Sequence, residues 1–275
     1  MYFVLLSANS TKDTRRPHNG DGFGVAWYTD PKLGPEPCIF TSTIPAWNCL
    51  NLERLASKTV SSLIFAHVRA TTEGNLSDQN CHPFGFKSLL WMHNGNIGGW
   101  EHVKRRLCSW IGDRWFMGVQ GSTDSEWAFA LFLDSMEKLG HNPNSAPGES
   151  GFSHKVLRQA LLKTIERINE LTSDIPEQYK SADTVSLLNF AVTDGHSVVC
   201  SRYVSSKSDE AASLFFSSGT SWTPPSKASD KGEYKMERRD KGADIVLVAS
   251  EPLTFERGLY SSIVQLPSQL ANSSL

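Results

Sequence analysis

The stretch Leu63-Ile-Phe-Ala-His67-Val-Arg69, followed after a polar loop by Ser88-Leu-Leu-Trp-Met-His93-Asn-Gly95, decides the fold. Its two apolar runs contain no charged residue, which is typical of buried β-strands. Each run ends in a polar cluster, and we expect the two strands to pair so that both clusters reach the same end of one sheet. Binding sites are commonly built at such ends of rigid elements. The stretch therefore predicts half of a small-molecule site.

The composition is that of an ordinary globular protein. The 275 residues are 39% apolar and 20% charged, with a formal net charge of -2, and a chain of this length can bury a substantial core. Binding to a phosphate backbone needs a basic face. Apart from short clusters at 104–106 and 238–239, the basic residues are scattered, so we expect no nucleic-acid partner.

The sequence also predicts a cytoplasmic location and no membrane partner. No apolar run approaches the roughly 18 residues that span a bilayer, and the opening Tyr2-Phe-Val-Leu-Leu lacks the basic region of a signal peptide. The five cysteines form neither an even set nor a Cys-x-x-Cys pair. That pattern is typical of reduced thiols rather than of a disulfide framework or a zinc knuckle.

Hydrophobic periodicity predicts strands, then a block of helices, then strands again. Glycines at 20, 22 and 24 precede aromatic and branched residues, which indicates a turn that feeds a strand, whereas a phosphate-binding glycine loop leads into a helix. Helical spacing occurs at 50–60, 100–111, 127–133 and 155–171, and strands are expected at 185–192, 197–204, 214–217 and 245–249. The dipeptide Asp194-Gly195 predicts a hairpin turn.

This order indicates an α+β fold with largely antiparallel sheets inside and helices outside. We expect one domain over 1–266, a tail at 267–275, and exposed loops at about 141–154 and 218–242, where the sequence turns polar. The helix at 127–133 begins with a capping box, in which Thr123 reaches the backbone N–H of Glu126 and Glu126 reaches back to that of Thr123. Because 127–133 contains no charge, this helix should be buried on most sides.

Three features offer chemistry, and each also has a purely structural interpretation. Arg69 at a strand end suits a carboxylate, or forms a structural salt bridge. Asn94-Gly95 offers a side-chain amide beside an uncrowded backbone N–H, a workable pair of oxyanion donors, or forms a tight turn. Asp124 in a helix first turn stabilises the helix dipole. If Asp124 and Arg69 face the same cavity, however, the pair complements a zwitterionic α-amino acid.

The histidines at 67, 82 and 93 raise the question of a metal site. No two of them form the i, i+4 pair of a helical metal site, and imidazoles beside strand ends are usually satisfied by local hydrogen bonds. We therefore expect no metal and no cofactor.

Five ordered motifs carry a family resemblance: Asn-Gly-Asp-Gly-Phe-Gly at 19–24, His-Val-Arg-Ala-Thr at 67–71, Cys-His-Pro-Phe at 81–84, His-Asn-Gly at 93–95 and Thr-Asp-Ser-Glu at 123–126. Together they resemble class II glutamine amidotransferases of the N-terminal nucleophile hydrolase superfamily. The similarity is greatest to a subgroup that includes the amidotransferase subunit of the fungal glutathione-degradation complex and the γ-glutamyl hydrolase of ergothioneine synthesis.

The resemblance implies an αββα sandwich of two largely antiparallel sheets between helical layers, and cleavage of a γ-glutamyl amide bond. It assigns Arg69 to the substrate α-carboxylate, Asp124 to the α-amino group, and Asn94 with Gly95 to the oxyanion. We add Thr71 and His93, which lie in the same motifs, to the expected substrate-binding residues. The resemblance also implies a metallopeptidase-like partner subunit.

The sequence departs from the family pattern at its start. Family members carry a cysteine directly after the initiator Met, and its thiol attacks the amide while its own α-amine serves as base. Here Tyr2 occupies that position, and a phenol with a pKa near 10 is not a substitute. Cys81 is the cysteine nearest to a motif, but it has no free α-amine. The segment before Arg15 is also shorter than the family pattern, which has a core strand there. The first core strand is then missing or altered, unless residues 2–6 fill its place.

Three hypotheses follow. The first is an amidohydrolase acting on glutamine, glutathione or a related compound, whose true N-terminus is absent from this sequence. The second is a catalytically inactive γ-glutamyl-binding or regulatory subunit. The third is an unstable fragment without a function of its own.

Overall fold

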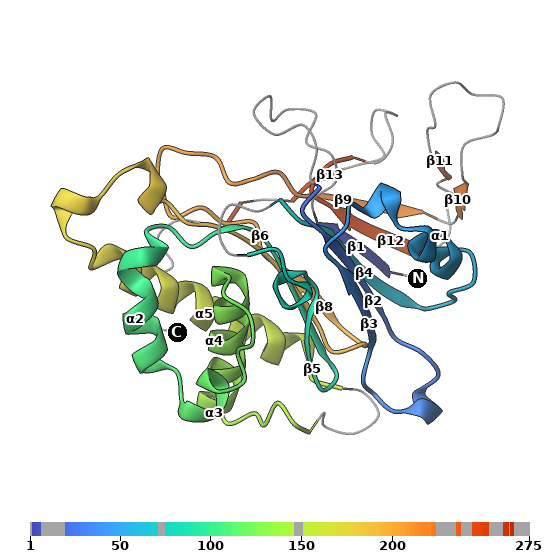
Figure 1. Cartoon of the computed structure of the whole chain (residues 1–275), viewed down its shortest axis with the longest axis horizontal. Helices are drawn as coiled ribbons and strands as arrows, with labels where there is room; N and C mark the ends of the chain where they lie inside the picture. Colours follow the sequence, from blue (N-terminus) through green and yellow to red (C-terminus); the bar gives the residue numbers. More distant parts are fainter. Residues whose placement is uncertain are drawn as a thin grey trace.

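Two sheets packed face to face form the centre of the molecule (Figure 1). The computed structural model describes residues 20–70, 75–145, 151–219, 244–252, 261–263 and 265–266, with the backbone of 2–6, 221–223 and 235–237. The larger sheet has seven strands in the order β13-β9-β12-β1-β4-β2-β3, and the smaller has four in the order β5-β6-β7-β8. The helices α2 to α5 cover the outer face of the smaller sheet, so the layers expected for an αββα sandwich are present on this side.

The strand bounds are as follows: β1 Tyr2–Leu6, β2 Phe23–Trp27, β3 Cys38–Ser42, β4 Leu63–Val68, β5 Phe84–Phe86, β6 Leu89–Asn96, β7 Leu187–Thr193, β8 Val198–Cys200, β9 Phe215–Gly219, β10 Ser221–Thr223, β11 Lys235–Glu237, β12 Ile245–Ala249 and β13 Ser261–Ser262. The helices are α1 Leu50–Ala56, α2 Trp100–Trp110, α3 Asp113–Phe116, α4 Asp124–Lys138 and α5 His154–Ser173. All neighbouring strands pair antiparallel except β1, which runs parallel to both β4 and β12.

The expectation that β4 and β6 pair in one sheet is wrong, because they lie in the two facing sheets. The reason lies in β6, whose apolar run is buried on both faces. Leu89 and Trp91 pack toward the helices, whereas Leu90 and Met92 pack against Phe65 and other residues of the larger sheet. A strand of this kind belongs in the middle of a sandwich, where burying each large side chain contributes about 1.5–3 kcal/mol.

A strand is present at the start of the chain, so of the expected alternatives the structure has the one in which residues 2–6 fill the place of the first core strand. The backbone of β1 lies inside the seven-stranded sheet, with Tyr2 opposite Leu63 and Leu6 opposite His67. Because β1 runs parallel to β4, Tyr2 lies at the end of the sheet where β4 begins, and Leu6 lies at the end where the His67 cluster is.

Helices α4 and α5 confirm the helical spacing of apolar residues that the sequence predicts. In α5 the expected face, Leu157, Leu161, Ile165 and Ile168, is buried. Helix α4 is buried on most sides, as its uncharged run predicts. The capping box is confirmed only in part, because the Thr123 hydroxyl accepts from the Glu126 N–H at 3.4 Å, whereas the Glu126 carboxylate accepts from the N–H groups of Gln120 (2.9 Å) and Gly121 (2.6 Å). The chain folds back before the helix and brings these two donors to the carboxylate.

The expected loops are only partly loops. In 141–154, Phe152 is buried and His154 begins α5. In 218–242, β9 continues to Gly219, and β10 pairs with β11 as an antiparallel hairpin. Residues 146–150, 220, 224–234 and 238–242 of the two expected loops lie outside the described residues, as does the tail at 267–275. The domain bounds 1–266 stay a prediction.

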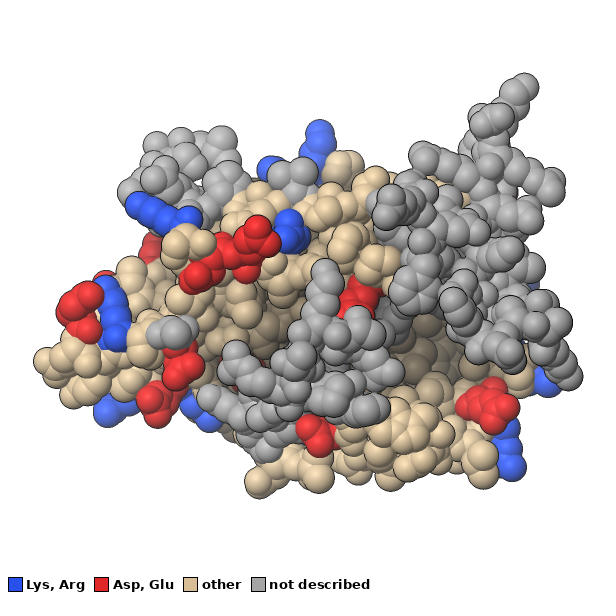
Figure 2. All heavy atoms as spheres, turned by 90° about the horizontal axis from the view of Figure 1, so that it is seen from above, with Lys and Arg blue, Asp and Glu red and all other residues tan. Residues whose placement is uncertain are grey.

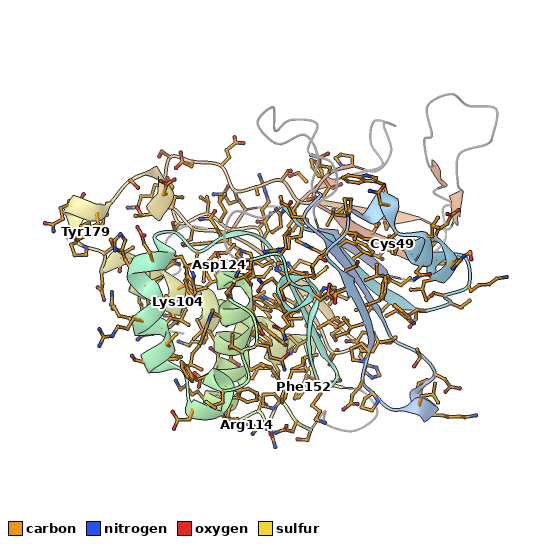
Figure 3. The ribbon with its side chains drawn as sticks, in the orientation of Figure 1. Cys49, Lys104, Arg114, Asp124, Phe152 and Tyr179 are labelled. Atoms are coloured by element: carbon orange, nitrogen blue, oxygen red, sulfur yellow. The ribbon has the colours of Figure 1, made fainter. Side chains whose placement is uncertain are left out.

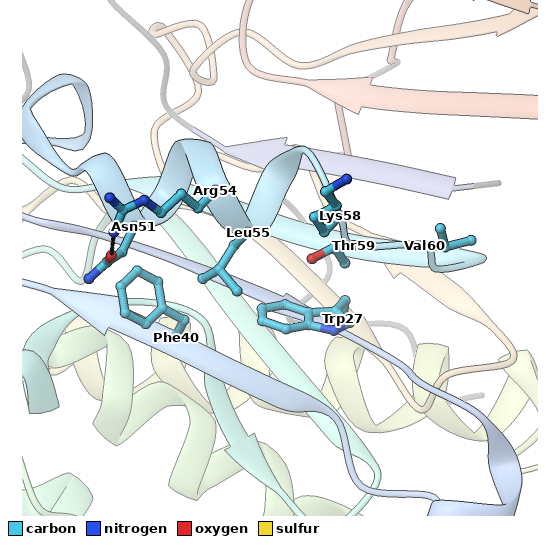
Figure 4. Close-up of a pocket in the computed structure, with 8 residues that line it drawn as sticks. All are labelled: Trp27, Phe40, Asn51, Arg54, Leu55, Lys58, Thr59 and Val60. Carbon is cyan, nitrogen blue, oxygen red and sulfur yellow. Dashed lines mark hydrogen bonds between the residues drawn. The ribbon is translucent and has the colours of Figure 1, made fainter.

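The outer face of the larger sheet carries α1 and an open groove (Figure 4). The groove has a volume of about 650 Å³, and Trp27, Phe40 and Leu55 line it. Helix α1 has no buried residue, and Val60 beyond it is 91% exposed. In the part of the chain that the structure describes, this sheet face is therefore covered less completely than the face that packs on the smaller sheet.

Two surface observations bear on the expected partners. Basic and acidic side chains are interspersed on the face shown in Figure 2, so the described residues of that face form no large patch of a single charge. Among the described residues, no helix is both long and apolar enough to cross a membrane.

Candidate functional site

Three buried histidines bring the predicted motifs together across the sandwich. His67 comes from β4, His93 from β6, and His82 from the segment between them. The rings of His67 and His82 have centroids 4.1 Å apart, and the His93 backbone N–H donates to His82 Nδ1 at 3.5 Å. Each is at most 6% exposed. The two polar clusters therefore meet, although their strands belong to different sheets.

Burial keeps these imidazoles neutral. It lowers the pKa of His67 to about 3, and nearby His93 and Arg69 add to the effect. Burial also lowers the pKa of His82 and that of His93, although Asp124 opposes the shift at His93. In the described part of the chain, no group of three or more His, Cys, Asp or Glu side chains is arranged to hold a metal ion.

Arg69 is held against the glycine-rich turn. Its backbone N–H donates to the Gly22 carbonyl at 2.8 Å, its carbonyl accepts from the Asp21 N–H at 3.2 Å, and its Nη1 donates to the Asp21 carbonyl at a long 3.5 Å. The residue as a whole is 4% exposed. Gly22 has φ of +114°, and a Cβ there would lie 2.7 Å from the Ser42 carbonyl. The turn therefore positions Arg69, a role that the sequence pattern did not reveal.

Asn94 and Gly95 bring the end of β6 to the surface. Gly95 is exposed and Asn94 is half-buried. Gly95 has φ of +141°, and a Cβ would lie 1.9 Å from the Leu187 carbonyl, so the close approach of β7 requires glycine here. The pair remains accessible beside the buried histidines.

Asp124 begins α4, at the end of the helical layer opposite Arg114 in Figure 3. Its Oδ2 accepts from the Ile97 N–H at 2.7 Å, and its Oδ1 accepts from the Ser125 hydroxyl at 3.2 Å. Asp124 lies next to Ser125, whose Oγ is 3.2 Å from Asp124 Oδ1 and 2.9 Å from His93 Nδ1. Arg69 follows His67 by two residues, directly after β4, so both charged residues lie beside the histidine cluster. The arrangement can complement a ligand with one anionic and one cationic group.

The remaining predicted residues are placed differently. Thr71 lies outside the described residues. His93 is buried, and both of its ring nitrogens are engaged, Nδ1 with Ser125 Oγ and Nε2 with the Leu187 carbonyl, each at 2.9 Å. Its predicted contact with substrate stays a prediction, but the geometry favours an indirect role.

Asn80 is a buried bridging residue that the sequence did not indicate. It is 2% exposed, its Oδ1 accepts from the Ser122 N–H at 2.9 Å, and its Nδ2 donates to the Asn75 carbonyl at 2.8 Å. The amide ties the loop before His82 to the start of α4. Its partner is 42 positions away in the chain, and no local pattern signals such a pairing.

The described structure brings no activated nucleophile beside Arg69. Tyr2 lies opposite Leu63, six residues before Arg69, and at about 3.3 Å per residue its backbone is roughly 20 Å away along the strand. Cys81 is near Arg69, but it is 2% exposed, and burial raises the pKa of its thiol despite the opposing effect of Arg69. Cys81 is therefore held as a thiol rather than as the reactive thiolate.

A substitution at Gly24 tests whether the backbone at His82 must lie against β2. A Cβ at Gly24 would lie 2.1 Å from the His82 carbonyl oxygen, so Gly24→Ala should force the backbones apart and lower the free energy of unfolding by about 1–3 kcal/mol. Gly118→Ala is the matched control, because its Cβ would lie 3.4 Å from the nearest heavy atom. Urea unfolding of both variants checks this, and equal midpoints would contradict the close approach.

Comparison with known proteins identifies the family of the chain. The family model described as class II glutamine amidotransferases matches residues 4–200. The Saccharomyces cerevisiae protein named "Probable glutamine amidotransferase DUG3" is 52% identical over 253 residues, covering 91% of this chain and 69% of that protein. An uncharacterized Methanocaldococcus jannaschii protein is 30% identical over 141 residues, 49% of this chain and 36% of its own.

A solved structure supports the fold. The glutamine aminotransferase class-II domain protein from Silicibacter pomeroyi has a TM-score of 0.57 and 25% identity, and the match covers 88% of this chain and 83% of that chain. With the family model matching well over half of the sequence, the chain belongs to the class II glutamine amidotransferases.

Proposed function

We propose that the site binds the glutamyl head group of a γ-glutamyl amide such as glutamine or glutathione. Arg69 takes the α-carboxylate as a fixed cationic fork, and Asp124 takes the α-ammonium group. The observation that supports this most is that both residues lie beside one buried histidine cluster, Asp124 next to the Ser125 that contacts His93 and Arg69 directly after the strand that carries His67. Because the imidazoles are neutral, they do not compete with Arg69 for the carboxylate or repel the ammonium group.

The reaction that this site would support is hydrolysis of the γ-amide. Asn94 and Gly95, accessible at the end of β6, would stabilise the oxyanion that forms on the amide carbonyl. Removing one such donor typically costs about 2.7–4 kcal/mol of barrier. We place the activity in the cytoplasm, a reducing compartment with which the five unpaired cysteines are compatible. We also propose that it serves glutathione degradation, together with a metallopeptidase-like partner subunit.

The nucleophile separates two forms of this proposal. In the first, the active protein carries a Cys at its N-terminus that the present sequence does not include, and it hydrolyses the amide. In the second, the chain binds γ-glutamyl compounds without turnover. The Tyr2 backbone lies at the end of β4 away from Arg69, so Tyr2 is not the nucleophile in either form.

Calorimetry and a glutamate-release assay on the purified chain test both forms. We expect heat of binding with glutamine or glutathione and no glutamate release, and we expect release once a Cys-bearing N-terminal segment precedes the motifs. Asp124→Asn should weaken binding, whereas Asp113→Asn, at the equivalent first position of α3, should not. A cooperatively folded chain that binds neither compound would refute the proposal, and a chain with no cooperative melting would instead support the unstable-fragment hypothesis.

A further inference from the structure

The outer face of the larger sheet is apolar across three of its strands. The cross-strand partners of β2, β3 and β4 on this face are Val25, Trp27, Phe40, Ile64 and Ala66. The residues between them point the other way, as Ala26 and Phe65 show by packing on the smaller sheet. An antiparallel sheet that faces water is normally polar on that side. The sequence of these strands is therefore that of a face with a cover.

Helix α1 covers this face only in part. It is seven residues long and none of them is buried. Between the helix and the strands lies the groove of about 650 Å³, with Trp27 and Phe40 on the strand side and Leu55 on the helix side (Figure 4). Leu50 at the start of α1 is 69% exposed and Val60 beyond its end is 91% exposed. An exposed apolar surface of this kind, rimmed by polar residues, marks a site of interaction.

The rim of the groove carries two cations. Arg54 on α1 and Lys58 just after it both line the groove, and both are exposed. Within the described structure neither forms a salt bridge, and Arg54 Nη1 donates to Asn51 Oδ1 at 3.3 Å, the dashed line in Figure 4. No acidic side chain is among the described residues that line the groove. An acidic group brought to this rim would therefore meet two cations and no competing carboxylate.

Shape and charge together select the kind of occupant. The rings of Trp27 and Phe40 lie in the floor of the groove, where inserted side chains reach them and a flat lipid surface does not. Two cations are too few for the basic face that nucleic acid requires. An amphipathic helix, in contrast, lays an apolar stripe into such a groove and keeps its charged residues at the rim.

We propose that the groove between α1 and strands β2 and β3 is a docking site for a partner protein. The docking segment of the partner is an amphipathic helix whose apolar side chains contact Trp27, Phe40 and Leu55, and whose acidic side chains pair with Arg54 and Lys58. The groove lies on the sheet face opposite to the one that carries the histidine cluster. The proposal is therefore independent of the γ-glutamyl site.

A pair of synthetic helical peptides tests the chemistry of the occupant. Both carry leucines at positions i, i+4 and i+7, and the flanking positions are glutamates in one peptide and lysines in the other. We expect the glutamate peptide to shift the indole N–H resonance of Trp27, assigned with Trp27→Phe, and to bind roughly 10-fold more tightly than the lysine peptide. Equal affinities, or a Trp27 resonance that neither peptide shifts, would overturn the proposal.

Charge reversal localises the effect. Arg54→Glu combined with Lys58→Glu should invert the preference, so that the lysine peptide binds more tightly. Lys155→Glu combined with Arg158→Glu, at two exposed basic residues of α5, is the matched control and should leave the preference as it is. A preference for the glutamate peptide that survives reversal of Arg54 and Lys58 would show that the groove does not bind it.

Val60→Ser separates the proposed occupant from two others. Because Val60 is 91% exposed, this variant should fold normally and bind both peptides more weakly. Self-association of the chain that Val60→Ser abolishes in sedimentation would place a second copy in the groove. Binding to anionic lipid vesicles that the same variant abolishes would place a membrane there. We expect neither result, and either one would overturn the assignment to a different protein.

Discussion

Arg69→Ala is expected to remove most of the affinity for glutamine. Arg69 is 4% exposed, and an ion pair made at such a buried position gains from the low local dielectric. Truncating one partner of a buried, hydrogen-bonded charge pair costs about 2–5 kcal/mol, which weakens binding by roughly 30-fold to several thousand-fold. Isothermal titration of glutamine into the purified variant measures the change.

Arg69→Lys separates charge from shape. Lysine keeps the positive charge but not the planar fork that matches a carboxylate, so its affinity should fall between those of the alanine variant and the unaltered chain. Arg105→Ala, which removes an exposed arginine of α2, should leave binding unchanged. Melting curves show which variants remain folded. If folded Arg69→Ala binds glutamine as the unaltered chain does, Arg69 does not hold the carboxylate.

Local pattern was enough to predict most of the elements. The strand expected at 245–249 coincides with β12, and the helix expected at 155–171 differs from α5 by one or two residues at each end. Both signals come from the spacing of apolar residues within the element itself. The Asp194-Gly195 turn is likewise local, and Gly195 has the positive φ of +91° that such turns require.

Strand pairing could not be predicted in the same way, because a strand chooses its neighbours from the whole chain. The two strands of the opening stretch have similar apolar runs but different environments. In β4 buried and half-buried residues alternate, whereas the first five residues of β6 are all buried. The uninterrupted run Leu89-Leu90-Trp91-Met92 was the available signal that β6 lies between two layers.

The motifs predicted that the two polar clusters lie close together, but not how their residues contact one another. The contact of His93 with Ser125, and the bridging role of Asn80, depend on partners 32 and 42 positions away. Polar residues with such distant partners leave no periodic trace in the sequence, so these contacts required the fold.

Acidification is expected to destabilise the protein steeply, because the buried histidines must remain neutral. Burial lowers the pKa of His67 from 6.5 to about 3, so between these values the unfolded chain binds a proton that the folded chain does not. Stability is then full above about pH 6.5 and falls as the pH decreases toward 3, by about 1.4 kcal/mol per pH unit. His67 alone accounts for a loss on the order of 5 kcal/mol, comparable to the total stability of many domains. His82 and His93, whose pKa values burial also lowers, act in the same direction.

Urea unfolding at a series of pH values between 7 and 4 measures this dependence. His67→Phe keeps an aromatic ring against His82 but removes one titrating group, so the slope of unfolding free energy against pH should decrease by about 1.4 kcal/mol per unit. The variant also removes His67 Nδ1, a buried nitrogen that has no hydrogen-bond partner in the described structure, so its stability at low pH should exceed that of the unaltered chain. Replacing the exposed His154 with Gln should leave the slope as it is. If His67→Phe and the unaltered chain lose stability in parallel, proton uptake at His67 does not drive acid unfolding, and the neutral cluster beside Arg69 would have to be reconsidered.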